Sequence, residues 1–406
     1  MHLGVFLNQL TPQYGGAFTF QETIAKSLMR AKTSHKVTGF FYGEGHFSFE
    51  NQPNVRFVKL KKETKVDNWA SKYGRIQTKL KSFLENEAIE QVTRTPLYQA
   101  AWDEKIDLMW FPTQAIEYVE VPYIYTVWDM QHRLQPYFPE VSVTGCTFAQ
   151  REKAFLGAIP RAAYVTVPNA AAADELQLFY GMPKERIRQI RQPVSEFATN
   201  PTSVGADESV IPKAPFLFYP AQFWPHKNQI VILEALKILI DKHKRDLCVV
   251  FTGSDKGNLD YVKSYAVRLG IESRVKFLGF VSKETLTCLY QRAFALTFSS
   301  FFGPENMPPM EAFALKCPVI ASAVAGAREQ MGDAALYFDP RNENELVTAI
   351  LQMQDEKGLR EKLVASGVRR AADCTGDHYI ENIFGIVNEF ASVRRCWSSE
   401  KRYSHT

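Results

Sequence analysis

The sequence has few cysteines and no long apolar run. Its 406 residues include only six cysteines, with no CxxC or Cys/His ligand spacing. This scatter argues against a disulfide framework or a zinc site and favours a reducing, cytoplasmic environment. No stretch of about 18 consecutive apolar residues occurs, so we expect no membrane-spanning helix. The first residues, MHLGVFLNQLTPQYGG, lack a basic region before the apolar stretch, and we expect a buried first strand there instead of a signal peptide.

The chain also lacks an excess of charge. The formal net charge is +4, which is too small to indicate a nucleic-acid-binding protein. With 46% hydrophobic and 23% charged residues the composition is that of a soluble globular protein. A chain of this length exceeds what one hydrophobic core usually supports, so two domains are expected.

Short apolar runs alternate with longer helical patterns along the whole chain. This alternation predicts an α/β fold with parallel sheets that are covered on both faces. The polar, aperiodic residues 196–214 are interpreted as a linker between two doubly wound domains, at 1–195 and 215–376. Ligands of such sheets bind beyond the carboxyl ends of the strands, so two facing domains predict a binding cleft between them.

The stretch SSFFGPENMPPMEAFALK suggests an anion site in that cleft. A predicted strand over 294–300 is followed by the loop FFGPENMP and by a helix over 308–316 that opens on proline. Backbone amides at such a helix start favour a phosphate. Glu311, one turn further, is placed to accept hydrogen bonds from paired sugar hydroxyls, as acidic residues do with ribose in dinucleotide folds. The alternative is a solvated glutamate that the helix dipole favours.

Three segments, 216–236, 275–300 and 299–340, resemble in order and spacing the donor-binding region of the family-four retaining glycosyltransferases, also known as glycosyl transferases group 1. The resemblance implies the GT-B fold, in which two Rossmann-like domains face a cleft. It also implies that the last segment, 377–406, holds a helix that returns to the N-terminal domain and a tail.

The resemblance assigns the nucleotide-binding residues of the C-terminal domain. It implies that Glu311 holds the ribose and that the amides of Asn306 and Met307 contact the distal phosphate. Lys227 in WPHKN matches the phosphate-binding lysine, whose charge would stabilise a diphosphate leaving group. A lone lysine at a helix start is otherwise more often a solvated charge. Backbone groups near Phe280 and Val281 would contact the base, although a structural explanation fits both residues equally well.

The chain departs from the family pattern at two of these places. The first of two paired glutamates falls on Gly303, and Glu305 is a candidate substitute that lies two residues out of register. A second basic residue of the family falls on Ala221, which leaves His226 or Gln222 to take part of that function.

The N-terminal domain contributes a glycine pair and a polar strand end. Gly15 and Gly16 lie between a predicted strand and helix; they form either a close contact with the ligand or a plain tight turn, and their spacing is not the GxGxxG of NAD-binding proteins. The family has a His-Asp pair after a later strand. Here Trp128 replaces the histidine, Asp129 remains, and His132 follows. We expect Asp129 and His132 to line the cleft near the sugar; the alternative is a helix-capping aspartate and a surface histidine.

A basic segment lies in the first domain. Residues 56–81 contain nine basic and two acidic residues, and aromatic and aliphatic residues recur at helical spacing as far as Phe83. Residues 56–83 are therefore either a surface that contacts an anionic membrane on its inner face or a helix that packs on its own domain.

The resemblance implies an enzyme that transfers a hexose from a nucleotide diphosphate sugar to a hydroxyl of a saccharide or lipid-linked acceptor with retention of configuration, in surface polysaccharide synthesis. The GDP-, UDP- and dTDP-linked sugars all stay open as donors. We expect no metal ion, and no DxD-type loop follows a strand. We also expect no cofactor beyond the donor itself. One alternative is a nucleotide-sugar-binding partner subunit of weak or no activity, and another is a sugar-nucleotide epimerase.

Overall fold

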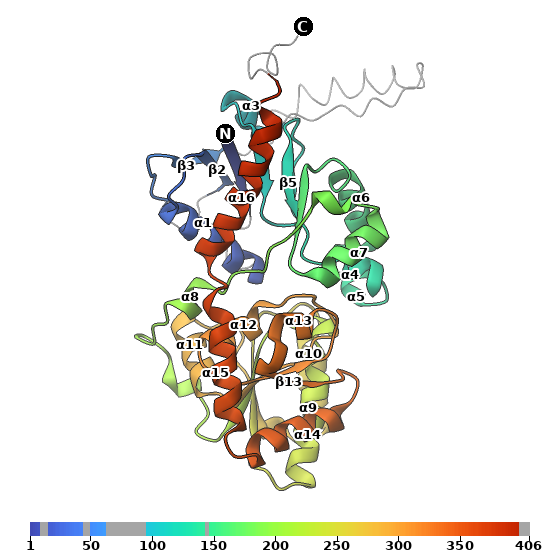
Figure 1. Cartoon of the computed structure of the whole chain (residues 1–406). Coiled ribbons are helices and arrows are strands. Elements are labelled where there is room, and N and C mark those ends of the chain that lie inside the picture. The colour runs from blue at the N-terminus through green and yellow to red at the C-terminus, as the bar shows by residue number, and fades with distance from the viewer. Residues whose placement is uncertain (9–14, 44–48, 62–94, 143–145, 398–406) are drawn as a thin grey trace.

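The computed structural model describes the chain except residues 9–14, 44–48, 62–94, 143–145 and 398–406. It has two α/β domains, one above the other in Figure 1, each built around its own parallel sheet. All pairings between the named strands are parallel. The predicted fold class, two doubly wound domains facing a cleft, is confirmed.

The N-terminal sheet has seven strands in the order β3-β2-β1-β4-β5-β6-β7. The order reverses after β1, the arrangement that opens a crevice at the carboxyl ends of doubly wound sheets. Its strands are β1 (His2–Leu7), β2 (Lys36–Tyr42), β3 (Val55–Leu60), β4 (Leu108–Phe111), β5 (Tyr123–Thr126), β6 (Tyr164–Val167) and β7 (Ile187–Gln189). The helices are α1 (Gly16–Arg30), α3 (Pro96–Asp103), α4 (Gln131–Leu134), α5 (Pro139–Ser142), α6 (Phe148–Ala158) and α7 (Ala170–Tyr180).

The C-terminal sheet has six strands in the order β10-β9-β8-β11-β12-β13. The strands are β8 (Phe216–Pro220), β9 (Cys248–Thr252), β10 (Val275–Phe277), β11 (Ala295–Phe298), β12 (Val319–Ser322) and β13 (Ala335–Phe338). The helices are α9 (Gln229–Asp241), α10 (Leu259–Arg268), α11 (Lys283–Arg292), α12 (Met307–Ala314), α13 (Ala327–Met331), α14 (Glu343–Asp355) and α15 (Leu359–Ala372).

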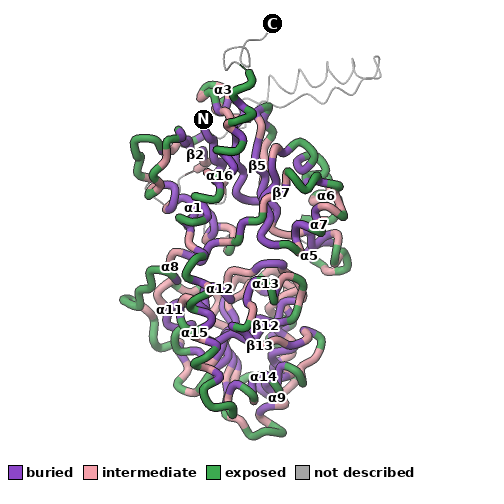
Figure 2. Tube along the Cα trace, in the orientation of Figure 1, coloured by how far each residue is buried: buried purple, intermediate pink, exposed green. Residues whose placement is uncertain are grey.

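The central strands are buried along their whole length, as Figure 2 shows by colour. They are continuous apolar runs because helices cover both faces of each sheet, which leaves no face for alternating polar residues. Strands were therefore predictable at these places. The exception is β7, whose sequence, Ile-Arg-Gln, is polar because the strand lies at the sheet edge and is only partly buried.

The last described helix, α16 (Gly376–Arg394), leaves the lower domain and packs against α1 of the upper one. Its apolar face enters the core of the N-terminal domain through Tyr379, Ile383 and Val387. The segment expected as a linker contains the short helix α8 (Glu196–Thr199), and Ala198 in it is buried in the C-terminal core. The two domains are thus joined by packed helices as well as by the chain crossing at residue 195.

Among the helices that the structure describes, none combines the length and the apolar composition that a membrane span requires. Of the basic segment 56–83, only Arg56–Leu60 in β3 and Lys61 lie within the described residues. The two interpretations of this segment therefore both stay predictions.

Candidate active site

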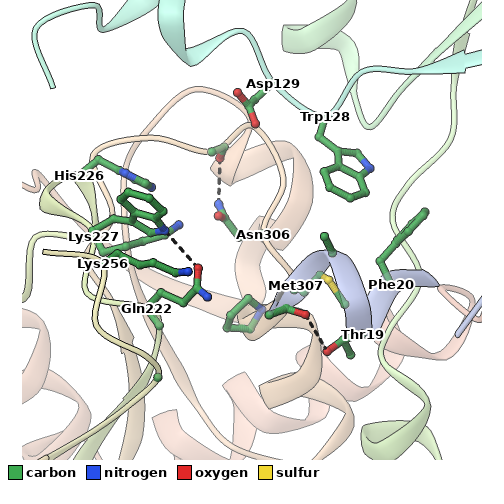
Figure 3. Close-up of a pocket in the computed structure, with 18 of the residues that line it drawn as sticks. Thr19, Phe20, Trp128, Asp129, Gln222, His226, Lys227, Lys256, Asn306 and Met307 are labelled. Carbon is green, nitrogen blue, oxygen red and sulfur yellow. Dashed lines mark hydrogen bonds between the residues drawn. The ribbon is translucent and has the colours of Figure 1, made fainter. Parts of the chain in front are cut away.

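A hollow of about 1190 Å³ lies between the domains. Its C-terminal wall consists of the segments that follow β8, β9, β10 and β11, and its N-terminal wall of the start of α1 and the segments that follow β4 and β5. Figure 3 shows the arrangement: Lys227, Lys256 and His226 lie on one side, Trp128 and Phe20 on the other, and Asn306 and Met307 between them. The carboxyl ends of both sheets thus face one cleft, as expected for this fold class.

Lys227 lies in the cleft at the end of a short turn, Pro225–Lys227, that follows β8. Two hydroxyl groups from the core, Tyr219 at 2.9 Å and Ser299 at 3.1 Å, donate hydrogen bonds to its backbone carbonyl. Its ammonium group lies 5.4 Å from the centre of the Phe298 ring. Burial lowers the pKa of Lys227 to about 8, while Asp129 and Glu140 across the cleft act to raise it. The lysine is therefore a positioned cation in the cleft, not a charge in bulk solvent.

Lys256 is a second cation in the cleft that the sequence analysis did not identify. It follows β9 in the loop GSDKG, 5.8 Å from the centre of the Trp224 ring. A lysine in a Gly-rich loop after a strand was the available signal. Of the two residues suggested for the missing basic charge, His226 is largely neutral at pH 7 because burial and Lys227 lower its pKa to about 4. Gln222 carries no charge and is held between Ser254 and Trp224.

The start of α12 offers fewer amides than a helix start usually does. Two of the residues in its first turn are prolines, which have no N–H, and the helix begins at Met307. The amide of Asn306 donates to Gln330 Oε1 at 3.1 Å, and Gln330 Nε2 donates back to the Asn306 carbonyl at 2.7 Å. A phosphate that used the Asn306 amide would have to displace Gln330. Asn306 and Met307 both line the cleft, and the amide of Met307 has no protein acceptor in the described structure.

Glu311 is buried in the floor of the cleft, which rules out a solvated glutamate. One carboxylate oxygen accepts a hydrogen bond from Ser195 Oγ and the other from the Tyr290 hydroxyl at 2.7 Å. Burial raises the pKa of Glu311, and these two donors act against that rise. Each carboxylate oxygen can accept more than one hydrogen bond, so hydroxyls of a ligand could still bind here.

Glu305 is a buried acid beside the same loop. Its Oε2 accepts the Gln192 amide at 2.7 Å, and its Oε1 lies 3.8 Å from Arg191 Nε. Burial raises the pKa of Glu305 from 4.5 to about 8, although both contacts oppose the rise. The uncharged acid therefore dominates at neutral pH in the folded chain. Glu305 is thus better suited to form hydrogen bonds than to act as an anion.

This pKa predicts a component of stability that depends on pH. Between about pH 5 and pH 8 the folded chain keeps the proton of Glu305 while the unfolded chain loses it, so the free energy of unfolding falls as pH rises. The limit is about 1.4 kcal/mol per pH unit. Glu305→Gln mimics the protonated acid and should lack this component. Urea unfolding at pH 5, 6, 7 and 8 measures it, with the exposed Glu361→Gln as control for loss of a carboxylate. Parallel stability curves for wild type and Glu305→Gln would contradict the prediction.

Gly15 and Gly16 begin α1 and line the cleft opposite the C-terminal domain. Gly15 has φ of +61°, and a Cβ there would lie 2.9 Å from Gln222 Nε2. The glycine therefore permits both a left-handed turn and a close approach of the two domains. Among the described residues, a Cβ on Gly16 would meet only Met307 Sδ, at 4.0 Å.

Trp128 and Asp129 follow β5 and line the N-terminal wall. The Trp128 ring packs edge-on against Phe20 with 5.2 Å between ring centres, and its Nε1 is buried without a partner among the described residues. Asp129 Oδ1 accepts the Gln131 amide at 3.1 Å. Asp129 is therefore a residue of the cleft whose side chain also accepts the first amide of the short helix α4, although Met130 is the N-cap residue of that helix.

His132 in α4 is fully buried, which excludes a surface histidine. It packs between the rings of Phe148 and Phe155, and its Nε2 lies 3.2 Å from Glu152 Oε2 and 3.0 Å from the Tyr180 hydroxyl. Burial lowers the pKa of His132. It still contributes to the lining of the hollow, but its nearest polar partners are protein groups.

Phe280 and Val281 line the cleft beyond the end of β10. The Phe280 side chain is 73% exposed. The carbonyl of Gly279, just before them, accepts the Gly253 amide at 2.7 Å, which ties this loop to the end of β9. Contact between a base and the backbone here stays a prediction. The described residues contain no group of three His, Cys, Asp or Glu side chains placed to hold a metal ion.

Comparison with known proteins agrees with this geometry. Residues 206–370 match the family model described as glycosyl transferases group 1. Among curated proteins, O-antigen chain mannosyltransferase B of Escherichia coli is 26% identical over 203 residues, covering 46% of this chain and 53% of that protein. O-antigen chain mannosyltransferase RfbU of Salmonella typhimurium is 33% identical over 134 residues, covering 32% and 36%. The chain thus matches about half or less of the length of these relatives.

The similarity of fold extends over nearly the whole chain. The crystal structure of HepE from Anabaena in complex with UDP-glucose superposes with a TM-score of 0.66, covering 96% of this chain and 100% of that one at 18% identity. At this identity the match concerns the fold alone. Taken with the two-sheet cleft, these findings show that the chain has the GT-B fold and that its residues 206–370 are similar to the glycosyl transferases group 1 family.

Proposed function

We propose that the chain transfers a hexose from a nucleotide diphosphate sugar to a hydroxyl group of a saccharide or lipid-linked acceptor, with retention of configuration. The observation that carries the proposal is the pair of cleft lysines, Lys227 and Lys256, opposite the wall formed by Trp128 and Asp129. A diphosphate fits the cationic wall, and a sugar attached to it would extend toward the opposite wall. The acidic floor at Glu311 suits the ribose hydroxyls.

The proposed reaction requires the protein mainly to position the two substrates and to stabilise the charge that develops on the leaving group. The bond between sugar C1 and the phosphate oxygen breaks, the acceptor oxygen bonds to C1 on the same face, and the leaving phosphate takes the acceptor proton. Lys227 would stabilise the negative charge that develops on the leaving diphosphate. Closing of the cleft would exclude water, which otherwise hydrolyses the donor. We expect this reaction to proceed without a metal ion, and thus to be unchanged by a chelator.

The relatives suggest the biological setting. Two of them are named O-antigen chain mannosyltransferases, which favours mannosyl transfer in surface polysaccharide synthesis and makes GDP-mannose the first donor to test. UDP-glucose is the second, because the similar HepE structure holds it. A lipid-linked acceptor for this polysaccharide would place the chain in the cytoplasm, at the inner face of the membrane.

A donor panel tests the proposal. The purified chain is incubated with GDP-mannose, UDP-glucose and dTDP-rhamnose, with and without simple glycoside acceptors, and release of nucleoside diphosphate is followed. Proton NMR of the product then reports the anomeric configuration, which should equal that of the donor. Binding of a donor without turnover would favour the partner-subunit alternative, to which Gly303, Ala221 and Trp128 point. An epimerised donor without acceptor would favour the epimerase.

A further inference from the structure

Glu140 is a buried acid that reaches the cleft from the N-terminal domain. It lies in the short helix α5 and is 2% exposed, yet it is among the residues that line the hollow. Its Oε1 accepts hydrogen bonds from His226 Nδ1 of the other domain and from Gln131 Nε2 at 3.3 Å. The contact with His226 places the acid beside Lys227, the next residue in the chain. Glu140 is therefore positioned relative to the cationic wall, although it belongs to the opposite domain.

The charges of this pair can be assigned. Burial and Lys227 lower the pKa of His226 to about 4, so its ring is neutral at pH 7 and donates Nδ1–H to the carboxylate. Burial alone would raise the pKa of Glu140, but the hydrogen bond from His226 and the smaller contributions of its other partners bring it below its ordinary value. Glu140 is thus a carboxylate at neutral pH, and its two oxygens can only accept hydrogen bonds.

The second oxygen of Glu140 lacks a partner. Oε2 is shielded from solvent, and no group among the described residues donates to it. A buried carboxylate oxygen without a donor is costly, so such an atom in a ligand-sized cleft indicates a position that a ligand fills. His226 and Gln131 already occupy Oε1, so the acceptor without a partner is the other carboxylate oxygen of a residue that lines the hollow.

Few chemical groups could donate the missing hydrogen bond to Glu140 Oε2. A phosphate would be repelled by the carboxylate, and the predicted base contacts lie at a different part of the cleft, after β10. A hydroxyl group donates to a carboxylate and carries no charge that would need compensation. We propose that Glu140 Oε2 accepts a hydrogen bond from a sugar hydroxyl in the cleft, and that Glu140 thereby selects the sugar. This inference rests on the proposed function.

Two sugars could supply that hydroxyl: the one transferred from the donor and the one in the acceptor. The test compares wild type with Glu140→Gln, which keeps the shape of the side chain, and with Glu140→Ala. Glu234→Gln is the matched control, because Glu234 also accepts a hydrogen bond from a side chain, Tyr265, but lies outside the cleft. Isothermal titration calorimetry measures Kd for GDP and for GDP-mannose, and for UDP and UDP-glucose.

The result expected for a donor hydroxyl is that the Glu140 variants bind the nucleoside diphosphate within about twofold of wild type but the nucleotide sugar about 10–100-fold more weakly, the range for a hydrogen bond to a charged group. If the hydroxyl belongs to the acceptor, both Kd values stay unchanged and the KM for the acceptor rises by the same factor. Glu234→Gln should change none of these constants.

Three outcomes would overturn the inference. Equal constants for folded wild type and Glu140 variants would show that the oxygen has no ligand. Equal loss of affinity for the nucleoside diphosphate and the nucleotide sugar would show that Glu140 only supports the domain contact through His226. A wild-type chain that neither binds nor turns over any nucleotide sugar would contradict the proposed function itself, and the inference would fall with it.

Discussion

Replacing Lys227 by alanine is expected to lower kcat/KM for the nucleotide sugar by about 10²–10³-fold, the typical loss for one preorganised group that stabilises developing charge. Lys227 lies in the cleft, its backbone carbonyl is held by Tyr219 and Ser299, and burial strengthens its interaction with an anion. Steady-state kinetics with the donor found by the panel measures the effect. Lys237→Ala, on the outer face of α9 and paired with Asp241, is the control and should stay near wild type.

The same residue predicts a pH dependence. Because burial lowers the pKa of Lys227 to about 8, the lysine loses its charge as pH rises through that value. Affinity for the nucleoside diphosphate should therefore be greatest below about pH 8 and fall above it, by up to tenfold per unit of pH. Lys227→Arg stays charged and should remove the decline. A loss of less than about threefold in Lys227→Ala, together with a flat profile in wild type, would contradict the assignment.

The largest expected effect on stability is that of Gly253→Ala. Gly253 follows β9 with φ of +125°, and a Cβ there would lie 2.4 Å from the carbonyl oxygen of Ala221. This is backbone, which cannot rotate away, and it belongs to the segment that leads from β8 to Lys227. We expect a loss of about 3–5 kcal/mol in the free energy of unfolding, from strain at positive φ together with the displacement of two strand ends. Denaturant unfolding measures it.

Gly257→Ala is the matched control for backbone strain alone. Gly257 also has positive φ, +95°, but a Cβ there meets no described residue within 4 Å. Its loss should be about 1–2 kcal/mol. If the two variants lose the same free energy, the close approach of Gly253 to Ala221 does not contribute, and the packing of the β8 and β9 ends has been misjudged.

Much of the cleft was predictable because its residues follow strands. Lys227, Glu311 and Asp129 were identified from local patterns together with the family resemblance, and the structure places all three in one hollow. The same patterns did not predict which protein groups bind individual atoms of the site. Nothing near Asn306 in sequence indicates that Gln330 occupies its amide.

Glu140 and Lys256 could not be found in the same way. Glu140 and its partner His226 are 86 residues apart and come from different domains, so no spacing within either segment relates them. The local signal for Lys256 was its place in a glycine-containing loop after a strand, and only the fold shows that this loop brings it to the cleft.

By itself, the sequence determined the two doubly wound sheets, because a strand covered on both faces must be an apolar run and such runs are visible without knowledge of their neighbours. It also determined which strand ends carry polar residues. Only the tertiary structure decided which of these groups are free to meet a ligand. Burial, partner choice and charge depend on atoms from distant segments, so the neutral His226, the protonated Glu305 and the unpartnered oxygen of Glu140 arise only when the two domains face each other.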